Sequence, residues 1–179
     1  RPQVIMIVSP HTSYFADAFS VNAHTNFISQ FNTFGDIITK KNWKGAPDLA
    51  AKIAHTANPG ARVPIRLVSE EKLDYGASVP LYFLTEHLPE CKILPIGFSN
   101  AGAKEHLQFG EIIKEICMDT DTRVALIASG DLAHTLTKNS PAGYHPHGAQ
   151  FDTSLQELLT ARNSMGIASL PEDVVKNAD

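Results

Sequence analysis

Apolar residues along the chain fall into short continuous runs separated by segments of helical spacing. One run, at residues 4–8, is rich in β-branched residues and lacks polar alternation, and two further apolar runs lie at residues 92–98 and 123–128. The first run predicts a strand that is covered on both faces, as in a parallel or mixed sheet. The second run predicts another apolar strand, and the third predicts a second core strand. Shorter strands are expected at residues 17–21 and 62–68.

Helices are expected between these strands, at residues 47–54, 78–88, 104–118 and 149–162. Asn58-Pro59-Gly60 should stop the first, and Pro80 is tolerable in the second only within its first turn. Another helix begins at Pro171, and the chain stops inside it. Residues 22–45 are polar and aromatic and predict a long loop that serves as a lid or an interface.

Strands that alternate with helices predict the α/β class, a layered fold with a central mostly parallel or mixed sheet flanked by helices. A length of 179 residues and a hydrophobic content of 43% suit a single domain over residues 1–179. The net charge of −4 argues against a nucleic-acid partner, which would select a basic face. The sequence contains no apolar run of the roughly 18 to 20 residues that cross a bilayer, so no membrane role is expected.

The number and spacing of the cysteines indicate the cellular compartment. Cys91 and Cys117 do not form a CxxC pair and cannot make a disulfide framework. Two small buried thiols suit a reducing compartment, which predicts a cytoplasmic protein. Both lie in apolar segments and lack the signature of a nucleophile.

Two polar clusters follow predicted strands, and each contains a histidine. His11 lies in Ser9-Pro10-His11-Thr12-Ser13, and His134 ends Ser129-Gly130-Asp131-Leu132-Ala133-His134. Ligands of open α/β sheets bind beyond the carboxyl ends of strands. The two imidazoles could therefore converge to bind a metal or move a proton. The alternative is that each histidine only hydrogen-bonds its own loop.

Two further clusters carry weaker signals. Asp74, before Tyr75-Gly76, could form a tight turn and cap the following helix. His145 and His147 lie two residues apart in a proline- and glycine-rich loop and could chelate a metal, although an exposed loop at a site mouth is the favoured interpretation. The sequence contains no GxGxxG, Walker or GxSxG motif for phosphate binding or serine catalysis.

Four segments in one order resemble a known superfamily. They are Ile7-Val8-Ser9-Pro10-His11-Thr12, the segment from Leu73 to Leu84, Ile127-Ala128-Ser129-Gly130-Asp131-Leu132-Ala133-His134, and Ala142-Gly143-Tyr144. They are similar to the class III extradiol ring-cleavage dioxygenases of the B-subunit type. The nearest branch is the uncharacterised one related to the Memo proteins, whose members often accompany AMMECR1-like and radical-SAM partners.

The resemblance implies a non-haem Fe(II), held by two histidines and a carboxylate, and an enzyme that opens a catechol-like ring with O2. By position, His11 matches a metal ligand and His134 the acid–base histidine, and Asp131 would orient the imidazole or its loop. Tyr75 stands where the family usually carries a histidine that contacts substrate or oxygen. A phenol can still donate a hydrogen bond there, but it is a poor base at neutral pH.

The resemblance also implies metal ligands that this sequence does not contain. The second metal histidine is expected before Arg1 and the acidic ligand after Asp179, so we expect N- and C-terminal segments of the full fold beyond this sequence. Two alternatives stay open: a non-catalytic, Memo-like module that binds a small molecule or a protein, and a zinc metallohydrolase on the same ligands. A homodimer is the default expectation for the assembly.

Overall fold

The computed structural model describes residues 1–57 and 63–178, which form two compact units, Arg1–Gly130 and Asp131–Asp179. The first unit contains the strands β1 (Val4–Ser9), β2 (Phe19–Asn22), β3 (Asn26–Phe31), β4 (Asp36–Lys44), β5 (Ile65–Val68), β6 (Lys92–Gly97) and β7 (Val124–Ala128). It also contains the 3-10 turn η1 (Asn32–Phe34) and the helices α1 (Pro47–Ala57), α2 (Tyr75–Leu84) and α3 (Ala103–Met118). The second unit contains α4 (Pro146–Thr160), α5 (Ser164–Ala168) and α6 (Glu172–Lys176). The prediction of a single domain stays a prediction.

A mixed five-stranded sheet in the order β5-β2-β6-β1-β7 forms the centre of the first unit. Strand β1 pairs in parallel with both β6 and β7, whereas β2 is antiparallel to β6 and parallel to β5. The predicted fold class and the three long strands are confirmed. The two shorter strands begin later than predicted, at Phe19 and Ile65, and Arg62 lies outside the described residues, as does the stop signal at residues 58–60.

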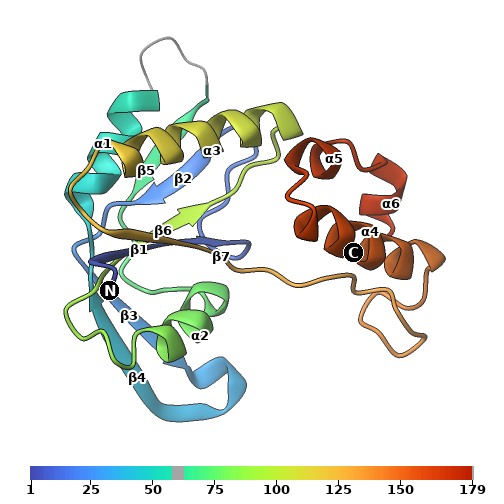
Figure 1. The fold of residues 1–179 in the computed structure, drawn as a ribbon. Helices are drawn as coiled ribbons and strands as arrows, with labels where there is room; N and C mark the ends of the chain where they lie inside the picture. The colour runs from blue at the N-terminus through green and yellow to red at the C-terminus, as the bar shows by residue number, and fades with distance from the viewer. Residues whose placement is uncertain (58–62, 179) are drawn as a thin grey trace. The chain divides into compact units, whose positions relative to one another are not determined.

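Two layers cover this sheet, as Figure 1 shows: α1 and α3 on one face, and α2 with the β3–β4 hairpin on the other. Because successive side chains of a strand point to opposite faces, β1 contributes to both layers. Val4 and Met6 pack with α1 and α3, while Ile5 and Ile7 pack with α2 and the hairpin. The lack of polar alternation in β1 is therefore the signature of burial on both faces.

The prediction of a loop over residues 22–45 is wrong. This segment forms the antiparallel hairpin β3–β4, in which Phe27 pairs with Trp43 and both side chains are buried. The pattern was misleading because a polar residue, Ser29, points inward and is fully buried, whereas Ile37 and Ile38 are 72% and 86% exposed. At these positions a polar side chain is buried and two apolar side chains are exposed, the reverse of the usual pattern.

Helix α2 begins three residues before the predicted start. Asp74 is its N-cap and accepts a hydrogen bond at Oδ1 from the backbone N–H of Ala77, 3.0 Å away. The expectation that Pro80 lies in the first turn is consequently wrong, because a start at Tyr75 places Pro80 in the second turn. The helix is partly exposed, and the Phe83 side chain is 69% accessible to solvent.

The remaining elements need smaller corrections. Strand β7 lies at the edge of the described sheet, none of its residues is fully buried and Leu126 is 56% exposed, so the prediction of a core strand is wrong. In the second unit the helix predicted at residues 149–162 is confirmed as α4, and the short helix α5 was not predicted. The last helix ends at Lys176, so the expectation that the chain stops inside it is wrong.

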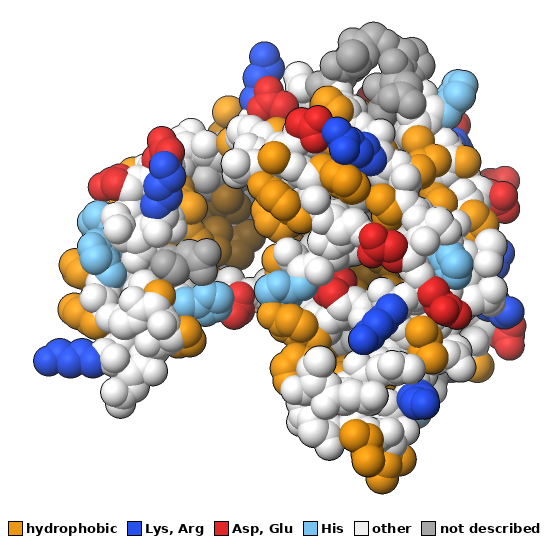
Figure 2. All heavy atoms as spheres, turned by 180° about the vertical axis from the view of Figure 1, so that it is seen from behind, with side chains coloured by type: hydrophobic (Ala, Val, Ile, Leu, Met, Phe, Trp, Pro, Cys, Tyr) orange, Lys and Arg blue, Asp and Glu red, His pale blue; other side chains and the backbone are white. Residues whose placement is uncertain are grey.

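Positive and negative side chains are mixed on the surface, as the small net charge suggests. Lysine and arginine side chains are interspersed with aspartate and glutamate on the face drawn in Figure 2. None of the described helices is long and apolar enough to cross a membrane.

Candidate functional site

The residues predicted as a metal ligand and a catalytic residue, His11 and Tyr75, meet at the carboxyl end of β1. His11 lies in the turn after Ser9, and Tyr75 is the first residue of α2. Tyr75 Oη lies 2.6 Å from His11 Nε2, and the rings stack with centroids 4.2 Å apart and planes inclined by 29°. The fold therefore joins two exposed side chains that are 64 positions apart in the chain.

A tight contact between β1 and the first turn of α2 holds this pair. Ser9, fully buried, donates a hydrogen bond from Oγ to Asp74 Oδ1 over 2.6 Å. A Cβ atom at Gly76 would lie only 2.6 Å from Ser9 Oγ and 3.2 Å from His11 Cδ2. Gly76 thus allows a closer approach of the helix to the strand than any other residue would.

An aromatic residue from the hairpin extends the site. Phe34, in η1, packs edge-on against Tyr75 with ring centroids 5.5 Å apart, and its side chain is 64% exposed. Sequence reasoning missed both Phe34 and Ser129, whose Oγ donates to the Gly76 carbonyl oxygen over 2.6 Å. The available signals were an aromatic residue in a segment assigned to a loop and a serine directly after an apolar strand.

The other predicted pair, Asp131 and His134, lies in the second unit. His134 Nε2 lies 2.6 Å from Asp131 Oδ2, with the two side chains 42% and 74% exposed. Backbone hydrogen bonds hold the loop, from Ala133 N–H to Asp152 Oδ1 at 2.8 Å and from His134 N–H to the Ala178 carbonyl oxygen at 2.7 Å. The orienting role of Asp131 stays a prediction. Because His11 and His134 belong to different units, their meeting at one reaction centre stays a prediction.

The described residues do not fit a complete metal centre. Among them, no group of three or more histidine, cysteine, aspartate or glutamate side chains lies close enough to hold a metal ion. His11 alone offers one imidazole, and its Nε2 atom already contacts the Tyr75 hydroxyl. In the second unit, His145 is the N-cap of α4 and accepts at Nδ1 from the backbone N–H of His147, 3.2 Å away. His147 lies inside α4, so the prediction that both histidines belong to an exposed loop is wrong.

The two cysteines are poor nucleophile candidates. Burial raises the pKa of both the Cys91 and the Cys117 thiol, although the Ile5 backbone partly opposes the shift at Cys91. A raised pKa reduces the thiolate fraction, and the thiolate is the reactive form. The prediction that neither cysteine is a nucleophile is consistent with this.

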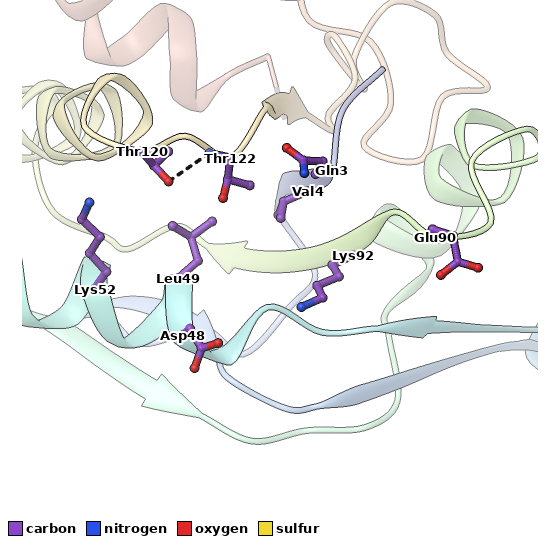
Figure 3. A pocket seen from close by; sticks show the side chains of 9 residues that line it. All are labelled: Gln3, Val4, Asp48, Leu49, Lys52, Glu90, Lys92, Thr120 and Thr122. Carbon is purple, nitrogen blue, oxygen red and sulfur yellow. Dashed lines mark hydrogen bonds between the residues drawn. The ribbon is translucent and has the colours of Figure 1, made fainter.

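A hollow of the first unit lies at the opposite end of the sheet. It has a volume of about 500 Å³ and is lined by Gln3, Val4, Asp48, Leu49, Lys52, Glu90, Lys92, Thr120 and Thr122, which Figure 3 shows. These residues include the amino ends of β1 and β6, so the hollow is separate from the His11–Tyr75 pair. Lys52 is already paired with Asp119, at 3.0 Å between Nζ and Oδ2.

Comparison with known proteins defines the class. The family described as the catalytic LigB subunit of aromatic ring-opening dioxygenase matches residues 1–179, so the chain belongs to this family. This shows the predicted relationship to class III extradiol dioxygenases.

Individual relatives are more distant. The chain is 31% identical to Protein CA_C1420 of Clostridium acetobutylicum, over 99% of the chain and 40% of that protein. It is 28% identical to 2,3-dihydroxyphenylpropionate/2,3-dihydroxicinnamic acid 1,2-dioxygenase of Photorhabdus laumondii, over 74% of the chain and 43% of that protein. It is 29% identical to 3,4-dihydroxyphenylacetate 2,3-dioxygenase of Escherichia coli, over 65% of the chain and 44% of that protein. The chain thus spans about two fifths of the length of these relatives.

A solved structure supports the fold. The crystal structure of protein JW3007 from Escherichia coli K12 matches with a TM-score of 0.61 and 22% identity, over 89% of the chain and 60% of that protein. At this identity the likeness concerns the fold alone.

Proposed function

We propose that this chain forms part of a non-haem Fe(II)-dependent extradiol dioxygenase, which opens a catechol-like ring with O2. Family membership supports the reaction class. The observation that carries the proposal is the stacked His11–Tyr75 pair at the carboxyl end of β1, where ligands of α/β sheets bind. A small aromatic substrate and O2 are the partners that it requires.

His11 would supply one imidazole to the metal, and further ligands must complete the centre. An imidazole coordinates a metal through the lone pair of one ring nitrogen. If that nitrogen is Nε2, the Tyr75 hydroxyl, now 2.6 Å away, must leave it. The released hydroxyl could then donate a hydrogen bond to a substrate hydroxyl, while the exposed Phe34 ring offers an apolar wall beside it.

His134 would move protons during ring opening. Asp131 Oδ2 lies 2.6 Å from His134 Nε2 and would accept a hydrogen bond from that nitrogen when it carries a proton. A carboxylate in this position orients an imidazole and stabilises its protonated form, as a general acid–base requires.

The test compares the purified intact polypeptide, including the segments that supply the other metal ligands, with its His11→Ala variant under anaerobic conditions. We expect one Fe(II) per protomer in the wild type and a large loss of iron in the variant, measured by metal analysis. With 3,4-dihydroxyphenylacetate or catechol as probe, only the wild type should consume O2 and form a ring-opened product.

A matched variant, His55→Ala, removes an exposed imidazole from α1 and should retain both iron and activity. Stoichiometric iron in His11→Ala would contradict the role of His11 as a ligand. Iron-loaded wild-type protein that opens none of a panel of catechols would contradict the proposed reaction.

A further inference from the structure

Pro80 leaves a backbone acceptor of α2 without its helical partner. In an α-helix the N–H of residue i donates to the carbonyl oxygen of residue i−4, so the partner of Gly76 would be residue 80. Pro80 has no N–H, and a proline ring also crowds the carbonyl four residues earlier. The Gly76 carbonyl oxygen therefore needs a donor from outside the helix.

Ser129 provides that donor. Its Oγ lies 2.6 Å from the Gly76 carbonyl oxygen, and the bond is partly buried. The backbone of Ser129 is itself held, because its N–H donates to the Val8 carbonyl oxygen over 2.9 Å. Ser129 thus connects β7, β1 and the first turn of α2, at the residue that follows Tyr75.

A second contact from β1 acts on the same turn. Ser9 Oγ donates to Asp74 Oδ1, on the other side of Tyr75 in the sequence. Asp74 and Gly76, the residues on either side of Tyr75, are therefore each bound by a serine from a strand end. A shift of this turn would move the Tyr75 ring away from His11.

We propose that Pro80 and Ser129 act together as positioning residues, the proline by freeing the Gly76 carbonyl and the serine by binding it, so that Tyr75 stays stacked on His11. Their importance for turnover rests on the proposed dioxygenase function, whereas their effect on the His11–Tyr75 pair does not. Satisfying a partly buried carbonyl also stabilises the protein, because an unpartnered buried acceptor is costly.

The test uses Ser129→Ala, Ser129→Thr, Pro80→Ala and the double variant Ser129→Ala/Pro80→Ala. Ser129→Ala should lower the melting temperature by about 2 to 10 °C. When Ser129→Ala is added to Pro80→Ala, the further fall in melting temperature should be at most half as large, because the new N–H of residue 80 can bind the Gly76 carbonyl oxygen. Equal losses in both backgrounds would refute the coupling.

The position of the pair is measured by NMR of the His11 ring protons, which the stacked Tyr75 ring shields. Ser129→Ala should shift them downfield toward unstacked values, and Ser129→Thr, which keeps the hydroxyl, should restore them. Thr153→Ala is the control, since it also removes a hydroxyl that donates to a helix carbonyl, that of Ala149, but in the second unit. Unchanged His11 signals in Ser129→Ala would overturn the positioning role.

Activity then separates this inference from the proposed function. If ring opening is found, Ser129→Ala should lower kcat by about tenfold or more, as misplacement of a reacting group does. If the wild type opens no ring, the proposed function fails, while the melting and NMR results still decide whether Pro80 and Ser129 position the pair.

Discussion

The two histidine pairs of this protein have equal donor–acceptor distances but arise in different ways. His134 and Asp131 are three residues apart and belong to one loop after β7. His11 and Tyr75 are 64 residues apart and meet only because β1 and the first turn of α2 pack together. The first pair depends on local chain geometry, and the second depends on the packing of separate elements.

Their chemistry differs too. A carboxylate accepts a hydrogen bond from imidazole and stabilises the protonated, charged form of the ring, which suits proton transfer. The Tyr75 phenol is stacked on the His11 ring and contacts one ring nitrogen, so it controls what else that nitrogen can bind. Both side chains of the Asp131–His134 pair are substantially exposed, and such surface pairs add little to stability, about 0 to 1 kcal/mol.

The largest expected effect is a loss of kcat when the Asp131–His134 pair is changed. His134→Ala should retain iron but lower kcat by about 10² to 10⁴, the usual loss for a general acid–base. Asp131→Asn should cause a smaller loss, because the imidazole remains but is less well oriented. Steady-state kinetics and metal analysis of both variants check this, and full activity in His134→Ala would contradict the assignment.

The next effect concerns the packing that builds the long-range pair. Gly76→Ala should destabilise the protein by about 1 to 3 kcal/mol, because the new methyl group crowds Ser9 and His11. Gly110→Ala is the matched control: it lies in α3, nothing lies within 4 Å of its added Cβ, and alanine favours a helix by about 0.5 to 1 kcal/mol. Denaturant unfolding should therefore give opposite signs, and stabilisation by both changes would show that the contact at Gly76 is not tight.

The smallest effect tests whether the phenol competes with a metal. Tyr75→Phe keeps the ring stack but removes the hydroxyl next to His11 Nε2. Losing that hydrogen bond, worth about 0.5 to 1.5 kcal/mol, should tighten Co(II) binding by about 2- to 12-fold in calorimetric titration. Weaker binding in the variant would mean that the hydroxyl supports the metal site instead.

The sequence by itself determined the fold class, the three long strands and the polar clusters that follow β1 and β7. These features are local: a run such as Ile5 to Ile7 has no polar side chain, which suits a strand buried on both faces. The proximity of Asp131 and His134 is equally local, because three residues of loop cannot carry them far apart.

Tertiary structure alone decided the rest. The β3–β4 hairpin was hidden because Ser29 points inward while Ile37 and Ile38 point outward, so its binary pattern contradicts its burial. Likewise Pro80 is accommodated in the second turn of α2 because a distant residue, Ser129, supplies the donor to the Gly76 carbonyl. Partners of this kind are separated by dozens of residues, and only the packed chain brings them within a hydrogen-bond length.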